Sequence, residues 1–219
     1  MPIYLIISIN CILIALLVHY TTHNEFRKRL VCKQLVSLNF IILLLLAQAK
    51  SQDRILFPYL FIGMISSFIG DFALAKAKIS RTNHFFRLGI GAFTITHSSQ
   101  ILMFAGLTSF NYWGLSFLVL INIYLSLHFR QKAQLPVRLY ATLTALNLAM
   151  LLSFSLSTAA VIDSTARMLL CIGILGFIMS DFVLLHVYFD HQAPKCFKPV
   201  YLILYTFGQM LTALSIAFI

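Results

Sequence analysis

The sequence predicts an all-α integral membrane protein with eight transmembrane helices. Of its 219 residues, 60% are hydrophobic and only 10% are charged, and the mean hydropathy is +0.92. A typical soluble chain carries about 45–50% apolar and about 25% charged residues, so this chain lacks the polar groups that would cover a water-facing surface. A separate soluble domain, a DNA-binding module, a secreted disulfide scaffold and a disordered tail are therefore excluded.

Eight apolar runs are candidates for spans. A transmembrane helix needs roughly 20 mostly apolar residues, and in hydrocarbon a helix satisfies its own backbone polar groups. The first run lacks the basic start and cleavage site of a signal peptide, so we expect it to remain as a span. The second and fifth are short, so their ends should lie in the headgroup zone or be shielded by neighbours. The runs cover about 2–18, 34–49, 55–75, 88–107, 113–128, 139–158, 168–189 and 200–219.

Lysines and arginines predict the orientation of these spans. The loops after the first, third, fifth and seventh runs hold 13 of them, and the remaining loops hold 3. By the positive-inside rule the basic loops are cytoplasmic, and both termini lie on the opposite side. No aromatic stacking platform lies beside the densest basic cluster, residues 27–29, so we expect no nucleic-acid partner. A compact chain without a targeting extension favours a bacterial inner membrane.

The sequence carries no motif for a metal, a cofactor or a common hydrolase nucleophile. Its four cysteines show no metal-ligand spacing, which predicts neither disulfides nor a structural zinc. No H-E-x-x-H, G-x-S-x-G or phosphate-binding glycine loop occurs. The usual zinc-protease and serine-hydrolase routes are therefore unsupported, and we expect no cofactor.

A short internal repeat predicts two related halves. The stretch FIGDFAL at 68–74 is similar to IMSDFVL at 178–184, and their aspartates are 110 residues apart. Both stretches lie in spans that run towards the cytoplasm. The repeat predicts two parallel four-helix halves, about 1–107 and 112–219, within a single transmembrane domain of residues 1–219.

Two aspartates, Asp71 and Asp181, fall inside predicted helices, whereas the other four acidic residues lie in loops. An ionised side chain in a membrane costs at least a few kcal/mol, so such residues usually mark a functional site. We interpret them as a functional pair that faces a common, water-poor chamber. A structural salt bridge, or a side chain that reaches the interface, is the alternative interpretation.

Further polar side chains fall at a similar depth, in the cytoplasmic half of the membrane or near its midplane. His97 shares a helix face with Gly89 and Phe93, and Tyr205 shares one with Tyr201 and Gln209. Taken singly, His97 or Gln209 would equally serve as an interhelical hydrogen bond. The candidate residues of the cavity are Lys33, His97, Tyr140, Tyr205 and Gln209. Asn10, Asn39, Asn122 and Asn147 are assigned only to packing between helices.

These residues resemble the lysoplasmalogenase (YhhN) family of small membrane proteins. In the first half the resemblance is carried by SFIGDFAL at 67–74 and by F-x-x-G-x-x-x-F-x-x-x-H at 86–97. In the second half it is carried by 136–140, Met150, G-F-x-x-S-D at 176–181 and Y-x-x-x-Q at 205–209. It covers the runs from 34–49 to 200–219, and the paired G-D and S-D motifs are its most specific part. Gln34 and Gln100 stand where the family commonly has proline and tyrosine.

The resemblance implies hydrolysis of the vinyl ether bond of lysoplasmalogens to a fatty aldehyde and a glycerophospho-ethanolamine or -choline. The partners it implies are a lysophospholipid substrate and the surrounding membrane lipid. A vinyl ether breaks when its β-carbon is protonated and water captures the resulting oxocarbenium-like cation. This chemistry needs one protonated acid, one anion and a dry pocket, and paired carboxyl groups perform related work on glycosidic bonds.

On this basis we assign roles to the candidate residues. Asp71 and Asp181 form the acid/base pair, without a decision on which is the acid. His97 orients one of them or the water, and Lys33 meets the phosphate at the mouth of the site. The single alkenyl chain lies between helices, so the substrate enters sideways from the membrane. Three side chains hydrogen-bond the glycerol or ether oxygen: Tyr140, Tyr205 and Gln209.

Three other functions fit parts of the sequence. Intramembrane carboxylates and repeated halves also suit a proton-coupled or lipid transporter. A metal hydrolase would use Asp71, His97 and Asp181, although two carboxylates and one histidine without a ligand motif disfavour it. A non-catalytic lipid-binding or assembly protein would not need the aspartate pair.

Overall fold

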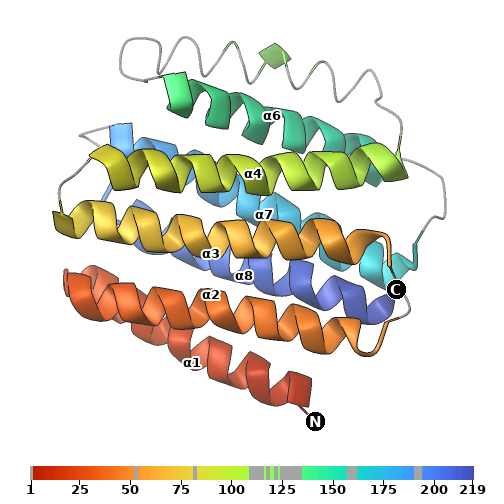
Figure 1. Cartoon of the computed structure of the whole chain (residues 1–219), viewed down its shortest axis with the longest axis horizontal. Helices are drawn as coiled ribbons and strands as arrows, with labels where there is room; N and C mark the ends of the chain where they lie inside the picture. Colours follow the sequence, from red (N-terminus) through yellow and green to blue (C-terminus); the bar gives the residue numbers. More distant parts are fainter. Residues whose placement is uncertain are drawn as a thin grey trace.

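The computed structural model describes residues 2–51, 54–80, 83–108, 116, 119–120, 123, 135–156, 162–189 and 194–219. Every regular element within these ranges is helical (Figure 1). A short 3₁₀ turn, η1, covers Ile216–Phe218 at the end of the chain. The long helices are α1 Pro2–Thr22, α2 Phe26–Gln48, α3 Leu56–Ser80, α4 Asn83–Leu107, α6 Leu135–Leu156, α7 Ser164–Phe189 and α8 Phe197–Ser215.

In the described part of the chain, seven helices are long and apolar enough to cross a membrane. Large apolar side chains such as Leu5, Leu102 and Ile172 are exposed on the outside of the bundle, which is the surface that lipid requires. The prediction of an all-α, multi-pass membrane protein is confirmed. The fifth predicted run, 113–128, lies largely outside the described residues.

Helix α2 begins earlier than the apolar run that predicts it. The run starts near residue 34, whereas the helix starts at Phe26 and includes the basic residues that follow. Hydropathy detects only the part of a helix that lies in hydrocarbon, and α2 continues about two turns further with one face against its neighbours. Arg29 and Lys33 are buried as a result, although the sequence places them in a loop and at a mouth.

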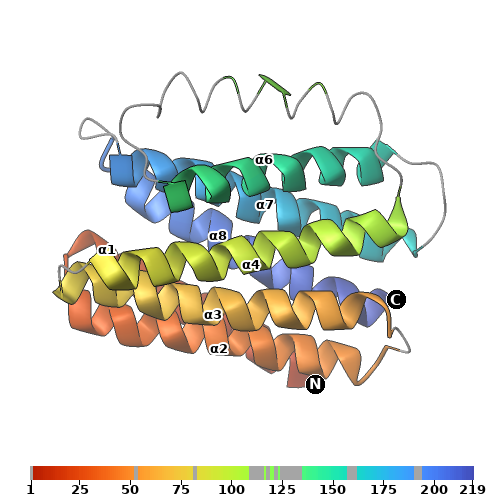
Figure 2. The ribbon, with the colours of Figure 1, turned by 45° about the horizontal axis from the view of Figure 1, so that its top comes forward.

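Successive described helices alternate in direction, with the exception of α4 and α6 (Figures 1 and 2). The chain runs one way in α1, α3 and α7 and the opposite way in α2, α4, α6 and α8, and both termini lie at the same end. α4 and α6 run in the same direction, as eight alternating spans would require. The eighth span, the two halves 1–107 and 112–219 and the non-cytoplasmic termini stay predictions.

One end of the bundle carries most of the positive charge. α1, α3 and α7 end there, and α2, α4, α6 and α8 begin there (Figure 2). We call it the basic end; the opposite end carries Lys50, Arg54 and Arg167. The location of the basic end on the cytoplasmic side of the membrane stays a prediction. Its described residues are Arg27, Lys28, Arg29, Lys33, Lys76, Lys78, Arg87, Arg138, Lys195 and Lys198.

Small residues let α7 and α8 approach closely. A Cβ atom placed on Gly208 would lie 2.7 Å from the carbonyl oxygen of Gly173 and 2.7 Å from the amide nitrogen of Phe177. Such backbone contact between helices is possible only where no side chain intervenes. On α3, the absence of a side chain at Gly70 makes room for the ring of Phe93, because a Cβ atom there would lie 2.8 Å from that ring.

The substitution Gly208→Ala should therefore force α7 and α8 apart. Overpacking of this kind costs about 1–3 kcal/mol, so we expect a lower midpoint of thermal unfolding in mild detergent. Gly91→Ala is the matched control, because a Cβ atom placed on Gly91 would have no neighbour within 4 Å and alanine favours a helix over glycine. Equal midpoints for the two variants would show that the close α7–α8 contact is not required.

Candidate active site

Asp71 lies in the middle of a ring of donors. Its side chain is fully buried on α3, and its Oδ1 lies 2.7 Å from the Lys33 ammonium. The Tyr205 hydroxyl donates to Oδ2 at 2.6 Å, and the Ser37 hydroxyl donates to the same oxygen. A full positive charge and two hydroxyl donors are the environment that a carboxylate anion needs in a low-dielectric interior. The group ties α2 and α8 to α3.

Lys33 occupies a different place from the one the sequence predicts. Only 8% of its side chain is exposed, and its ammonium points into the bundle. It lies 5.3 Å from the centroid of the Tyr205 ring, in addition to its contact with Asp71. The predicted contact with a phosphate at the mouth would have to compete with this buried ion pair.

Asp181 has a different environment. It is buried on α7, and its Oδ2 lies 2.8 Å from Nε2 of the fully buried His97. The Thr144 hydroxyl lies 3.1 Å from the same ring nitrogen, and the buried Tyr140 hydroxyl lies beside the carboxyl group. No lysine or arginine of the described residues forms an ion pair with Asp181. The two carboxyl groups are therefore held by chemically different partners.

Asn147 determines which nitrogen of His97 faces Asp181. Its amide nitrogen donates to Gln100 Oε1 at 2.5 Å and lies 3.1 Å from His97 Nδ1. With the amide donating to Nδ1, the hydrogen of the neutral imidazole is on Nε2 and points at the carboxyl group. The sequence assigns Asn147 only to packing. Its spacing of seven residues from Tyr140, which places both on one face of α6, is the signal that identifies it.

An aromatic cluster links the two carboxyl groups. The His97 ring stacks on Phe177 at 5.0 Å between centroids and 16° between planes, and Phe177 lies 5.9 Å from Tyr205. Phe93 packs 6.3 Å from both Phe177 and Tyr205. Both phenylalanines are buried. The rings of His97, Phe177 and Tyr205 thus form a continuous series of contacts between a partner of Asp181 and a partner of Asp71.

Gln209 and Tyr140 differ in how they relate to the carboxyl groups. Tyr140 lies next to Asp181, as described above. The Gln209 amide donates to the Ser67 hydroxyl at 3.3 Å, and Ser67 in turn lies 3.1 Å from the Thr96 hydroxyl. Gln209 therefore joins α8 to α3 and α4, which is the interhelical role that the sequence leaves open for it.

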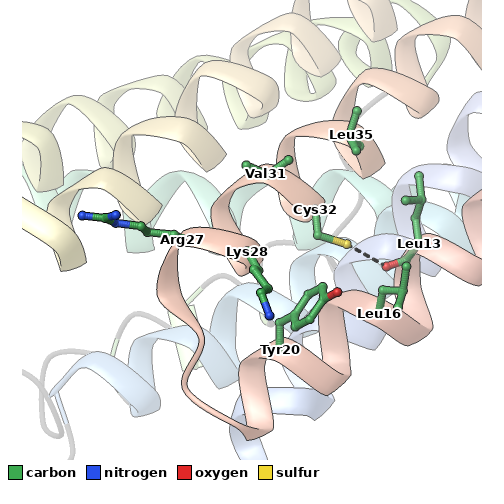
Figure 3. Close-up of a pocket in the computed structure, with 8 residues that line it drawn as sticks. All are labelled: Leu13, Leu16, Tyr20, Arg27, Lys28, Val31, Cys32 and Leu35. Carbon is green, nitrogen blue, oxygen red and sulfur yellow. Dashed lines mark hydrogen bonds between the residues drawn. The ribbon is translucent and has the colours of Figure 1, made fainter.

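One cavity lies away from both aspartates. It is an apolar groove of about 390 Å³ between α1 and α2 near the basic end (Figure 3). Lys28 reaches over the Tyr20 ring, 5.5 Å from its centroid, whereas Arg27 points away from the other lining side chains. Neither aspartate lines it, so we do not place the chemistry there. The lining residues are Leu13, Leu16, Tyr20, Arg27, Lys28, Val31, Cys32 and Leu35.

Among the described residues, no three side chains of histidine, cysteine, aspartate or glutamate are grouped in a way that could hold a metal ion. His97 and Asp181 form a pair, and the partners of Asp71 are a lysine and two hydroxyl groups. The residues proposed for a metal hydrolase thus occupy two separate environments.

Comparison with known families identifies the family of the chain. A family model described as the YhhN family matches residues 28–216, which contain all the candidate site residues. The chain belongs to the YhhN family. Comparisons with curated proteins and with solved structures find no match. In this YhhN protein the matched range takes in nearly all of α2 and all of α8, and it excludes α1.

The buried ion pair predicts that loss of one partner destabilises the protein more than loss of both. Lys33→Met leaves the Asp71 carboxylate buried without its cation, which costs about 3–5 kcal/mol, so the midpoint of thermal unfolding in detergent should fall clearly. Adding Asp71→Asn to Lys33→Met should restore much of the loss, because the uncompensated charge disappears.

Lys28→Met provides the control. Lys28 pairs with Glu25 at 2.6 Å, but 63% and 36% of the two side chains are exposed, and such surface pairs contribute about 0–1 kcal/mol. Similar shifts for Lys28→Met and Lys33→Met would contradict the structural importance of the buried pair.

Proposed function

We propose that this YhhN protein is a membrane hydrolase that cleaves the vinyl ether bond of lysoplasmalogens. The products are a fatty aldehyde and a glycerophospho-ethanolamine or -choline. The observation that carries the proposal is the pair of buried carboxyl groups, Asp71 and Asp181, in unlike environments on either side of an aromatic cluster. Family membership supports the same reaction class.

The unlike environments assign the two roles. Ser37 and Tyr205 donate to Asp71 and the Lys33 ammonium forms an ion pair with it, so we assign it as the ionised carboxylate. Asp181 has an imidazole N–H on Oδ2, which leaves Oδ1 to carry a transferable proton. Pairs of carboxyl groups that their surroundings hold in opposite protonation states are the usual acid and base of hydrolases.

The first step is proton transfer to carbon. Asp181 gives its proton to the β-carbon of the vinyl ether, and the carbon–carbon double bond supplies the electrons of the new C–H bond. Positive charge then develops on the α-carbon and the ether oxygen. The Asp71 carboxylate and the faces of Phe93 and Phe177 favour that charge, because a cation is attracted to a nearby anion and to the face of an aromatic ring.

Water completes the reaction. Its oxygen bonds to the α-carbon and its proton passes to Asp71, which gives a hemiacetal. Asp71 then returns this proton to the ether oxygen as the carbon–oxygen bond breaks, and the hemiacetal hydroxyl proton passes to Asp181. Aldehyde and glycerophospho-alcohol leave, and both carboxyl groups recover their starting states. In this scheme His97 and Asn147 are positioning residues for Asp181, and Tyr140 and Tyr205 bind the glycerol or ether oxygen.

We further propose that the protein lies in a bacterial inner membrane with the basic end in the cytoplasm. The concentration of lysine and arginine at that end supports this orientation. The alkenyl chain of the substrate would then lie among the apolar helix faces, and its polar head would lie towards the basic end.

A proton-coupled or lipid transporter is the second candidate. The compensated Lys33–Asp71 pair in the bundle interior favours it, because paired charges of this kind also line ion pathways. The two functions separate in one assay. A hydrolase releases aldehyde from lysoplasmalogen in detergent solution, whereas a transporter requires two compartments and leaves the lipid intact.

Asp71→Asn and Asp181→Asn should each abolish most of the aldehyde release while the protein still folds; Asp71→Asn leaves the buried Lys33 without its anion, so it should also lower the midpoint of thermal unfolding. Loss of a group that transfers a proton in the transition state typically lowers the rate by about 10²–10⁴-fold. The measurement is aldehyde formation from lysoplasmalogen by purified protein, with elution as a single species as the test of folding.

Asp163→Asn is the matched control. Asp163 is exposed and precedes α7, where hydrogen bonding from the Thr165 backbone N–H holds its carboxyl pKa below the usual range. Asparagine also accepts a hydrogen bond at this position, so activity should be unchanged. Full activity in both Asp71→Asn and Asp181→Asn would rule out the acid/base assignment.

A further inference from the structure

Three cations from three helices surround one cavity at the basic end. The cavity has a volume of about 240 Å³ and is lined by Arg29 of α2, Lys78 of α3 and Lys198 of α8, together with Thr21, Asn24 and Phe26. The charges of Arg29 and Lys198 act on Lys78, which is half-buried. Like charges repel at this range, and more strongly away from bulk water. A bound anion would relieve this repulsion.

The described residues do not supply that anion. Within this part of the chain, none of the three cations forms an ion pair. The nearby Glu25 is already engaged with Lys28 at 2.6 Å, and this hydrogen bond holds the Glu25 pKa below its usual range. Asp71 is likewise engaged with Lys33.

Arg29 is incompletely paired. It is only 9% exposed, its Nη2 donates to the Tyr201 hydroxyl at 2.6 Å, and its Nε has no hydrogen-bond partner. A buried guanidinium N–H without an acceptor is costly, and a bound oxyanion removes that cost. Because guanidinium groups match the geometry of phosphate oxygens, this residue favours a phosphate ligand over a halide.

Arg29 is shared between two cavities. It lines a second, narrow cavity together with Lys33, Leu74, Leu184, Tyr188 and Tyr201. Arg29, Lys33 and Ser37 follow one another at four-residue intervals on one face of α2, a rise of about 6 Å each. Arg29 therefore lines both the wide cavity and a narrow one of about 10 Å³, and Lys33, which also lines the narrow one, contacts the Asp71 carboxylate.

We propose that Arg29, Lys78 and Lys198 form the binding site for the phosphate diester of the lysolipid headgroup. This inference rests on the proposed function. The cavity is smaller than the about 300–1,000 Å³ of sites that enclose drug-sized ligands, so it fits a headgroup and not a whole lipid. With the phosphate held here, the glycerol lies beside Arg29 and Tyr201, and the vinyl ether extends towards Asp71. Lys33 then belongs to the carboxylate and not to the phosphate.

The test is equilibrium binding to full-length protein in a nonionic detergent. The probe is radiolabelled lysophosphatidylethanolamine with an ester-linked chain, which has no vinyl ether bond. We expect Arg29→Gln and Lys78→Gln each to raise its Kd by about tenfold or more, as for loss of a charge-assisted hydrogen bond. A monoacylglycerol with the same chain lacks the phosphate, so its Kd should not change.

Arg27→Gln is the matched control, because it removes the same charge from the same end of α2 but lies outside the cavity. It should leave both dissociation constants unchanged. Inorganic phosphate, added as a competitor, distinguishes a site for a lysolipid headgroup from a site for free phosphate. Competition that is weaker than that of the lysolipid and is lost in Arg29→Gln supports a headgroup site, whereas phosphate that binds as tightly as the lysolipid would overturn it.

Unchanged lysolipid binding in both Arg29→Gln and Lys78→Gln would also overturn the inference, as would an equal loss in Arg27→Gln. Lys78 is only half-buried and has no hydrogen bond that joins two helices among the described contacts, so Lys78→Gln keeps the test valid if Arg29→Gln does not fold. Aldehyde release is measured in parallel. Arg29-dependent lysolipid binding without aldehyde release would reject the proposed function alone, and aldehyde release with unaltered KM in both variants would reject the phosphate site alone.

Discussion

The ion pair between Lys33 and Asp71 is the constraint on which the rest of the site depends. A lone carboxylate in the interior of a membrane bundle would carry a desolvation cost of several kcal/mol, and one lysine and two hydroxyl groups offset it. To supply these donors, α2 must extend with buried Lys33 and Ser37 along α3, and α8 must bring Tyr205 to the same point. The close glycine contacts of α3 and of the α7–α8 pair allow that approach.

The second carboxyl group shows why the site is asymmetric. Asp181 has no ammonium or guanidinium partner in the described part of the chain, and its hydrogen-bonding partner His97 is positioned by Asn147. The predicted repeat places aspartates on both α3 and α7 and relates their flanking helices, α2 to α6 and α8 to α4, but the side chains on those helices differ. Similar local sequences therefore produce one carboxylate matched to a cation and one matched to an imidazole. Such a difference is what acid/base chemistry requires of a carboxyl pair.

Hydropathy and charge alone predict much of this protein. The runs that correspond to the seven described long helices and the burial of the two aspartates follow from the sequence, because burying a charge in a membrane has few solutions. The sequence leaves open whether His97 contacts a carboxyl group or the water. The start of α2, the orientation of Lys33 and the roles of Asn147 and Phe177 do not follow from it. Each of these depends on which face of one helix meets which face of another, and a single sequence without pairing information does not specify that contact.

The basic end also shows that topology alone does not account for its charges. The positive-inside rule requires cations near the membrane surface but does not require them to be buried. Arg27 satisfies the rule while pointing away from its neighbours, whereas Arg29, two residues later, is turned into the bundle with Nε unpaired. The burial of Arg29 costs free energy that an exposed arginine would avoid, and orientation in the membrane gains nothing from it. The anion site proposed for Arg29, Lys78 and Lys198 would give that burial a physical reason.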